Sequence, residues 1–384
     1  MLKTSQRFSI SIVIALSSVL VLSSCAKRIE SGANVIELES SSSACKTSTD
    51  TISAGSITFS ITNTSNKVTE VYLFASDKKS IVSEAENIGP SISRDLVVEL
   101  SEGTYYIQCI PGMKGDGFST TLEVTPGSAS KAGAYQDELD QAAAYYKEFV
   151  INQATLLLQE TKKFATLYSS GKEAAARALY PHARMYWERI EPVAESFGDL
   201  DPILDLREAD LEEGQSWTGW HLIEKDLWAP TKGYQALTKK ERTAASNMLV
   251  EKTSELLTRV KSLEYKPFQM SNGAKELLDE VATGKVTGEE EIWSGTDLYD
   301  FQANIEGAEK VYELLKSVVA KKDPALSKKL ERGFANVYSL LDAQRSGTAF
   351  THYSQLSQKE ILEMAAAVDA LAEPLSHLTS VVVG

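Results

Sequence analysis

The pattern of apolar and polar residues changes once along the chain, close to residue 126. Before this point, short runs in which apolar and polar residues alternate predict β-strands. These runs occupy residues 56–61, 70–74, 95–100, 105–109 and 120–124, and clusters of Gly, Asn and Pro that favour turns separate them. Strands at this spacing over about 100 residues are typical of a β-sandwich.

After residue 134, apolar residues recur every three or four positions, as at Leu139 and Ala142, which predicts a helix from about Tyr135. Further helices are expected at roughly 173–196, 216–229, 238–263, 271–283, 296–321, 324–345 and 357–381. Pro181 and Pro192 lie within the first of these ranges and should bend or break that helix. The predicted fold class is therefore multidomain, with a β-sandwich followed by an all-α domain built from helical bundles.

The first 25 residues have the features of a secretory signal. Lys3 and Arg7 precede an apolar run at 10–22, which is too short to cross a bilayer because a spanning helix needs roughly 20 residues. The Leu-Ser-Ser-Cys sequence at 22–25 resembles the lipobox of bacterial lipoproteins and implies that Cys25 carries a lipid. The alternative is an ordinary cleaved signal that contains a cysteine. We therefore expect export and anchoring to the outer face of a bacterial membrane, at the cell surface or in the periplasm.

These patterns divide the chain into five segments. They are a lipoprotein signal peptide (1–25), a tether (26–34), a β-sandwich (35–126), a linker (127–134) and an all-α domain (135–384).

The charge of the exported chain excludes some classes of function. Without Lys3 and Arg7 the chain has 37 basic and 53 acidic residues, a net charge of −16. This balance argues against nucleic-acid binding, which needs basic patches, and against a protein that lies flat on anionic lipid. It suits solubility and the attraction of cations.

Carboxylates and one imidazole recur at helical spacing in the second half of the chain. Glu188 and Glu191 share one helix face, His221 and Glu224 share another, and Asp205 lies between the two pairs. Such residues, projecting into a bundle, form helical carboxylate-metal sites, and their oxygen and nitrogen atoms suit iron, manganese or zinc better than copper(I).

A purely structural role is the alternative for these residues. The two glutamates could form salt bridges with Arg184 or Arg189, and His221 could be a core histidine that packs among tryptophans. Neither His-Glu-x-x-His nor His-x-x-Glu-His occurs, which argues against a zinc peptidase. A glycine-rich phosphate loop and a nucleophile elbow are also missing from the sequence.

The strand region contains Cys45 and Cys109, which form either a disulfide, as export to an oxidising compartment favours, or a pair of thiolate ligands. With Glu70, and with Glu37 or Glu39, the two thiolates could hold a metal. The sequence from Cys109 to Met113 suggests a cupredoxin loop, but a blue-copper site needs two histidines. All four histidines of the chain lie after residue 134.

Three stretches are similar to the signature of EfeO-type iron-uptake lipoproteins, which belong to the imelysin-like group. They read YWERIEPVAESFGDLDPILD (186–205), WTGWHLIEKDLW (217–228) and TGEEEIWSGTDLYDFQANIEGAEKV (287–311). The resemblance covers nearly the whole exported chain. It implies a cupredoxin-like N-terminal domain followed by an imelysin-like helical domain.

The resemblance also implies a set of site residues. In the helical domain the metal ligands would be Glu188, Glu191, Asp205, His221 and Glu224, together with one residue of the run 289–291, for which we take Glu290. In the strand domain they would be Cys45, Glu70 and Cys109. Gly295 departs from the family pattern, because family members often carry histidine there, so the composition of the site is expected to differ.

The function that the resemblance implies is iron capture, without catalysis, in a ferrous-iron uptake system. The helical domain would bind ferrous or ferric iron, with zinc as an alternative in vitro, and a membrane iron permease and a haem-dependent peroxidase would be the partners. The strand domain would bind copper or iron and support ferroxidase-like chemistry. Two other functions stay open at this point: a metallopeptidase that uses His221 and Glu224, and a metal-free module that binds a polymer or surface ligand.

Overall fold

The computed structural model describes residues 34–127, 135–211, 214–230 and 232–383. The predicted signal peptide with Cys25, the tether up to residue 33 and the linker from residue 128 lie outside the described residues. Residues from Asn34 onwards form one compact unit. None of the helices in the described ranges is long and apolar enough to cross a membrane.

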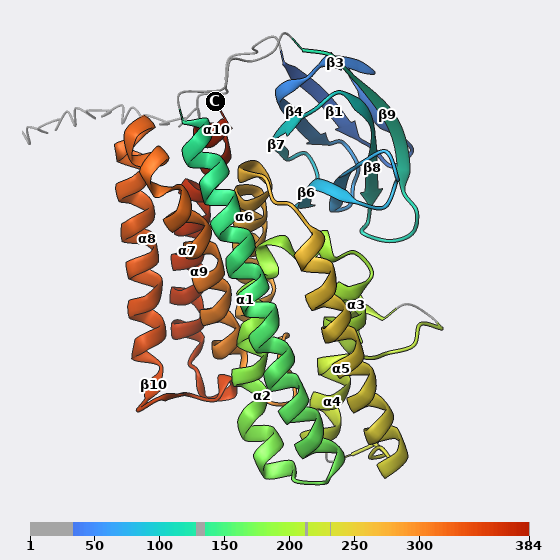
Figure 1. Cartoon of the computed structure of the whole chain (residues 1–384), viewed down its shortest axis with the longest axis vertical. Coiled ribbons are helices and arrows are strands. Elements are labelled where there is room, and N and C mark those ends of the chain that lie inside the picture. The colour runs from blue at the N-terminus through green and yellow to red at the C-terminus, as the bar shows by residue number, and fades with distance from the viewer. Residues whose placement is uncertain (1–33, 128–134, 212–213, 231, 384) are drawn as a thin grey trace, which may run out of the picture. The chain divides into compact units, whose positions relative to one another are not determined.

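The strand region forms two sheets (Figure 1). One has the order β2-β1-β4-β7 and the other the order β3-β9-β8-β5-β6. Alternate side chains of both sheets are buried, for example Ile36 and Leu38 of β1 with Val71 and Leu73 of β5, so the core lies between two half-apolar faces. The strands are β1 (Val35–Ser40), β2 (Cys45–Thr47), β3 (Thr51–Ser53), β4 (Gly55–Asn63), β5 (Thr69–Phe74), β6 (Ile81–Ile88), β7 (Ser93–Leu100), β8 (Gly103–Pro111) and β9 (Phe118–Thr125).

The five predicted strands are confirmed as β4, β5, β7, β8 and β9. The sequence pattern missed β1, β2, β3 and β6. In β6 the buried positions are Ser83, Ala85 and Ile88, and the first two are small. Its intervening residues, Glu84 and Glu86, are only partly exposed. Because the contrast in hydropathy between the two faces is small, the alternation that marks a strand is weak here.

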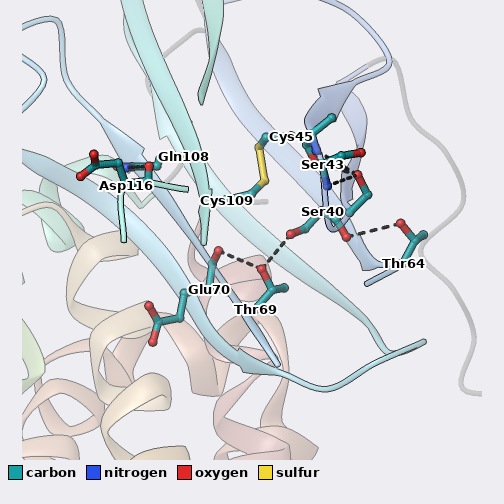
Figure 2. Close-up of a disulfide and its surroundings, with 11 residues drawn as sticks. Ser40, Ser43, Cys45, Thr64, Thr69, Glu70, Gln108, Cys109 and Asp116 are labelled. Atoms are coloured by element: carbon teal, nitrogen blue, oxygen red, sulfur yellow. Dashed lines mark hydrogen bonds between the residues drawn. A yellow bond between two sulfur atoms is a disulfide. The ribbon is translucent and has the colours of Figure 1, made fainter. Parts of the chain in front are cut away.

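A disulfide joins Cys45 at the start of β2 to Cys109 in β8, whose Cα atoms lie 5.5 Å apart (Figure 2). This corrects the metal set of Cys45, Glu70 and Cys109, because neither sulfur is a thiolate that could bind a metal. Glu70 also points away from the sulfur atoms (Figure 2). The reason is strand geometry: Val71 pairs with Cys109 across β5 and β8 and shares its buried face, so the preceding residue faces the other side.

The helical region confirms the predicted all-α part, and its helices α1 and α5 run side by side (Figure 1). The predicted face of α1 is buried at Leu139, Ala142, Tyr146 and Val150. The helices are α1 (Gln136–Ser169), α2 (Glu173–Glu188), α3 (Leu200–Asp205), α4 (Trp220–Leu227), α5 (Lys239–Ser262), α6 (Pro267–Thr283), α7 (Asp297–Lys322), α8 (Pro324–Ala343), α9 (Gln358–Leu375) and α10 (Leu378–Val383). Short 3-10 turns are η1 (Glu191–Phe197), η2 (Glu208–Asp210), η3 (Lys285–Thr287) and η4 (Tyr353–Gln355), and β10 (Arg345–Ser346) pairs with β11 (Ala349–Phe350).

Pro192 ends the helix that the sequence predicted over 173–196, whereas Pro181 lies inside α2 without ending it. Pro192 has no backbone N–H, so the carbonyl of Glu188, four residues earlier, has no helical partner. The side-chain amide of Asn304 from α7 donates to this carbonyl at 3.1 Å. The break therefore turns the end of α2 into a point of attachment for α7.

The α6 helix packs against the strand region. Phe268 is buried in the core of the sheets, and the side-chain amide of Asn272 donates to Ser83 Oγ at 3.0 Å and to the carbonyl of Val97 at 2.9 Å. Arg94 of β7 forms ion pairs with Glu276 and Asp279 of α6. Directional bonds and apolar burial together hold strands β6 and β7 against α6.

Candidate metal centre

The predicted ligands come from five segments, which are the end of α2, η1, the end of α3, the start of α4 and the turn at 288–296. Three of these ligands, Glu188, Asp205 and Glu290, surround one buried guanidinium. Gly219, just before α4, has φ +88°, and a Cβ there would lie 2.1 Å from the carbonyl oxygen of Leu204. Only glycine therefore lets α4 begin so close to α3.

His221 belongs to both groups of potential ligand atoms that lie close together among the described residues. Its side chain and that of Glu224 are fully buried. Its Nδ1 lies 3.2 Å from Glu224 Oε2. Its Nε2 lies 3.4 Å from Asp205 Oδ1 and 3.4 Å from Glu290 Oε1, but makes no hydrogen bond to either oxygen. The potential ligand atoms of Asp205, His221 and Glu290 all lie within 4.8 Å of one another.

A second group combines His221 and Glu224 with Glu291, again within 4.8 Å. Glu224 Oε1 accepts hydrogen bonds from the backbone N–H groups of Trp293 (3.0 Å) and Ser294 (2.7 Å). Glu291 accepts from the hydroxyl of Tyr180 at 3.2 Å and from that of Ser294 at 2.8 Å. The turn after η3 thus supplies the donors that orient both carboxylates.

The structure shows which residues of the run 289–291 face inward. Glu290 and Glu291 are buried, whereas the Glu289 side chain is 48% exposed and pairs with Arg207 at 3.1 Å. The predicted Glu290 therefore lies at the centre, and Glu291, which the sequence could not single out, lies there with it.

Arg184 is the guanidinium that the acidic residues surround, and its side chain is fully buried. Its Nε lies 2.5 Å from Glu291 Oε1 and 3.5 Å from Asp300 Oδ1. Further ion pairs join it to Glu188, Asp205 and Glu290. The structural alternative of a salt bridge between Arg184 and Glu188 is thus present, but it is buried and shared by several carboxylates.

Glu188 and Glu191 lie beside a second internal cation. Lys285 Nζ lies 3.0 Å from Glu188 Oε2 and 2.6 Å from Glu191 Oε1, and its side chain is only 3% exposed. The Asn304 amide donates to both carboxylates. These two predicted ligands are therefore next to the His221 groups but are neutralised by an ammonium in this structure.

The pKa values show that the centre holds positive charge strongly. Burial and Arg184 oppose the charging of His221, but Glu224, Glu290 and Asp205 outweigh them and raise its pKa to about 10. Burial also opposes ionisation of Glu290, yet Lys285 and His221 hold the pKa of this carboxyl well below its ordinary value. The centre therefore keeps Glu290 ionised beside cationic partners, whereas burial and neighbouring carboxylates raise the pKa values of Glu191 and Glu291 well above their ordinary values.

The donor atoms fit a first-row metal ion. His221 Nε2 is buried and lies 3.4 Å from two carboxylate oxygens, which is close enough for ion pairs when the imidazole is protonated, but it makes no hydrogen bond to them. A metal ion that replaces this proton would be bound by all three atoms. Nitrogen and carboxylate oxygens suit iron, manganese or zinc, and the described residues contribute no sulfur to either group.

Comparison with known proteins agrees with this geometry. The family model described as Imelysin, of the M75 peptidase group, matches residues 142–378. This chain belongs to the imelysin family. The matched range contains every residue of the centre and leaves the strands β1–β9 outside it.

Curated relatives place the chain more closely within the imelysin family. An Efem/EfeO family lipoprotein of Staphylococcus haemolyticus is 42% identical over 257 residues, which cover 66% of this chain and 88% of the relative. Efem/EfeO family lipoproteins from two Staphylococcus aureus strains, MSSA476 and MRSA252, are each 42% identical over 255 residues. The resemblance to EfeO-type proteins is confirmed.

Gly295, the departure from the family pattern, has a physical explanation. Its φ is +63°, and a Cβ would lie 2.2 Å from Cε1 of His352. The imidazole of His352 thus occupies the space beside position 295. Because this imidazole is exposed and accepts a hydrogen bond from the backbone N–H of Ser354, it does not belong to the buried ligand groups.

Sequence reasoning missed Lys285, Asp300 and Asn304. Nothing in the sequence around Lys285 distinguishes it from a surface lysine. For α7 a signal was present, because Asp297, Asp300 and Asn304 recur at helical spacing among apolar residues and are all buried. Polar residues that interrupt an apolar helix face usually have buried polar partners.

Proposed function

We propose that this imelysin-family protein is a lipid-anchored, extracytoplasmic metal-binding component of a ferrous-iron uptake system. It captures iron at the buried centre around His221 and passes it to a membrane permease. The observation that carries the proposal is His221 Nε2, which is buried, without a hydrogen bond and 3.4 Å from an oxygen of each of two carboxylates.

Binding at this centre is an exchange of cations. The apo centre neutralises its carboxylates with a protonated imidazole, Arg184 and Lys285. Iron replaces the proton of His221, because an imidazole must be neutral to bind a metal. Binding therefore releases a proton, and the affinity for iron should fall as the pH falls.

The direct test is a titration of ferrous and ferric iron into the purified chain. His221→Ala and Glu290→Gln should each abolish tight binding, because both residues belong to the same ligand group. His377→Ala is the matched control, since its imidazole is 60% exposed and lies outside both ligand groups. Unchanged tight binding in His221→Ala would disprove the proposed centre.

Lipid anchoring on Cys25 is part of the same proposal. The curated relatives are named lipoproteins, and Cys25 follows a signal-like segment in this sequence. A tether of this kind would raise the effective concentration of the iron binder beside an embedded permease. Cys25→Ser should lose incorporation of a labelled fatty acid and move the protein to the soluble fraction, and retention in the membrane would contradict the anchor.

The partners proposed are a membrane ferrous-iron permease and a haem-dependent peroxidase of the same system. Their test is iron uptake by cells that carry His221→Ala in place of the parent gene, with the peroxidase present and deleted. Equal iron uptake in the parent and in His221→Ala would show that metal binding at His221 is not needed for transport.

A peptidase reaction is the weaker alternative. Its general base would be Glu224, but both oxygens of this carboxylate have partners, the imidazole of His221 on one side and two backbone N–H groups on the other. Metal-dependent cleavage of a peptide library that Glu224→Gln abolishes would be the result in its favour.

A further inference from the structure

The two ligand groups of the centre meet solvent through two of their five residues. His221, Glu224 and Glu291 have no exposed surface. Asp205 and Glu290 keep a small exposed fraction, and both line a cavity of about 420 Å³. A cation that reaches His221 from solvent therefore passes Asp205 and Glu290.

This cavity is strongly acidic. Residues of β5, β6, η1, α3 and α6 line it, and eleven of its eighteen described residues are Asp or Glu, among them Glu195 of η1. A wall of one sign of charge attracts ions of the opposite sign from solvent. Among the described residues of this acidic cavity, Arg207 alone is basic.

Arg207 lies on the path from the acidic cavity to the centre. Its Nη1 lies 3.4 Å from Glu290 Oε2 and 3.1 Å from Glu289 Oε1, and its Nε lies 2.7 Å from Asp210 Oδ2. The other oxygen of Glu290, Oε1, faces His221 Nε2. Glu290 thus lies between the imidazole on one side and the guanidinium of Arg207 on the other.

Exposure separates Arg207 from the two other cations that pair with the predicted ligands. Arg184 and Lys285 are buried among the carboxylates that they neutralise. The Arg207 side chain is 26% exposed, and its partners Asp210 and Glu289 are exposed as well. When the guanidinium leaves Glu290 it keeps two carboxylate partners and gains water. Because exposed ion pairs are weak and buried ones are costly to break, Arg207 is the cation that can give way.

The backbone that carries Arg207 is fixed on both sides, so the exchange of partners concerns the side chain alone. The indole N–H of Trp217 donates to the carbonyl of Leu206 at 2.7 Å. On the other side, Glu208 forms an ion pair with Lys225 of α4. A long side chain on a fixed backbone changes partners by moving between rotamers, which takes far less time than the movement of a loop.

We propose that Arg207 is a gating residue of the metal centre. In the metal-free protein its guanidinium pairs with Glu290 Oε2 and closes the path from the acidic cavity. An arriving cation displaces the guanidinium, which stays on Asp210 and Glu289 while Glu290 binds the metal. The gate rests on the proposed function, because it controls the entry of the ion that His221 binds.

The test is the rate at which Mn²⁺ enters the full metal-free chain, measured by stopped-flow fluorescence. Trp217 and Trp293 report on the centre, because the backbone N–H of Trp293 donates to Glu224 and the two rings lie 5.7 Å apart. Arg207→Gln removes the charge and keeps a polar side chain. We expect association to become about tenfold faster, which corresponds to one positive charge about 6 Å from a divalent ion in water, and dissociation to change by less than about threefold.

Arg259→Gln is the matched control, because it removes the same charge. Arg259 is also partly exposed and pairs with the exposed carboxylates of Asp199 and Glu255, which lie outside both ligand groups. Equal association rates in Arg207→Gln and Arg259→Gln would overturn the gate. A gain in affinity that comes from slower dissociation alone would also overturn it, since Arg207 would then act as a fixed counter-charge.

A second variant should change the rate in the opposite direction. Asp210→Asn with Glu289→Gln removes the two carboxylates that receive the guanidinium, so Arg207 should stay on Glu290. Association of Mn²⁺ should then slow by up to about tenfold. In a chain that also carries Arg207→Gln, the same two substitutions should have much less effect. Equal slowing with and without Arg207 would assign the effect to net charge and overturn the gate.

The gate and the proposed function fail in different ways. Tight Mn²⁺ binding that survives in His221→Ala refutes the metal centre and the gate with it. Binding that depends on His221, but has the same association rate in Arg207→Gln as in Arg259→Gln, refutes the gate alone.

Discussion

Replacement of Lys285 by methionine should make the metal-free protein less stable and its metal binding tighter. Lys285 is buried between Glu188 and Glu191, with its Nζ 3.0 Å and 2.6 Å from their carboxylate oxygens. Methionine has a similar length and carries no charge. The variant therefore removes the ammonium that pairs with both carboxylates, leaves Glu188 paired with Arg184, and changes the packing little.

The expected loss of stability follows from the burial of this ion pair. Removal of one partner from a buried pair typically costs about 3–5 kcal/mol in free energy of unfolding. Because one ammonium serves two carboxylates, we expect the upper part of this range, about 5 kcal/mol, near pH 8. Burial and repulsion from Glu188 already raise the pKa of Glu191 well above its ordinary value, so protonation of Glu191 should reduce the loss at pH 5.

Metal binding should change in the opposite direction. In the parent, a metal ion that uses Glu188 or Glu191 must displace the ammonium of Lys285. In the variant Glu188 keeps its pair with Arg184, but the ammonium that pairs with both carboxylates is gone. We therefore expect affinity for Fe²⁺ or Mn²⁺ to rise by about tenfold, or roughly 1.4 kcal/mol. Added metal should then restore much of the stability that the substitution removed.

The assay is urea unfolding of parent and variant, in a chelator and in excess Mn²⁺, together with a Mn²⁺ titration. Lys310→Met is the control, because Lys310 forms a partly exposed pair with Glu313 that should contribute less than about 1 kcal/mol. The reasoning would be refuted if Lys285→Met lost no stability in the chelator. Weaker metal binding in the variant would show that Lys285 assists the metal rather than competes with it.

Three further predictions concern the disulfide, the acidic cavity and the tight turn beside the centre. Replacement of Cys45 and Cys109 by alanine opens a loop of 64 residues and should lower the free energy of unfolding in urea by about 4 kcal/mol. The amount of bound Mn²⁺ should not change, and a lower metal stoichiometry would instead identify the sulfurs as ligands. Because the pKa of Glu195 is raised from 4.5 to about 7, the folded state favours its protonated form, so the melting temperature of the metal-free protein should fall by a few degrees as the pH rises from 5 to 8. Glu195→Gln should flatten this slope, and an unchanged slope would assign it to other groups. Gly295→His should lower the free energy of unfolding by about 1–3 kcal/mol, because position 295 has φ +63° and a Cβ there would contact His352. His352→Ala in the same chain should recover part of this stability in thermal unfolding. If it recovers none, the contact with His352 is not the cause of the loss.

The elements that the sequence predicted well are those whose pattern is local and strong. Eleven-residue or longer stretches with apolar residues every three or four positions became α1, α5, α7 and α8, and the ends of α5, α7 and α8 lie within two residues of those expected. The single helix expected over 357–381 is divided into α9 and α10. Pro192 broke its helix for a reason that is also local, the missing N–H. The strand β6 was missed because its two faces differ little in hydropathy, and a weak local signal cannot be separated from a loop.

The sequence also indicated the residue types of the candidate centre, but it did not show most of the charged partners of these residues. His221 with Glu224 and Glu188 with Glu191 were predicted from spacing along a helix. The pair of Arg184 with Glu188 within α2 was among the alternatives that the sequence offered. That Lys285 neutralises Glu188 and Glu191 depends on segments about 100 residues apart, and spacing within one helix carries no information about it. The same holds for Glu290 and Glu291, since three consecutive glutamates look alike until the turn that holds them is folded.

By itself, the sequence determined the two kinds of secondary structure, the excess of negative charge and the set of oxygen and nitrogen ligands that suits iron. The tertiary structure alone decided that Cys45 and Cys109 form a disulfide, that Glu70 faces the helices, and that β6 and α6 enclose an acidic cavity beside His221. Backbone preferences act over a few residues, whereas the partner of a buried charge is chosen by packing between distant segments. An acidic sequence therefore predicts that cations bind, and only the fold shows which carboxylates are already paired with an internal cation.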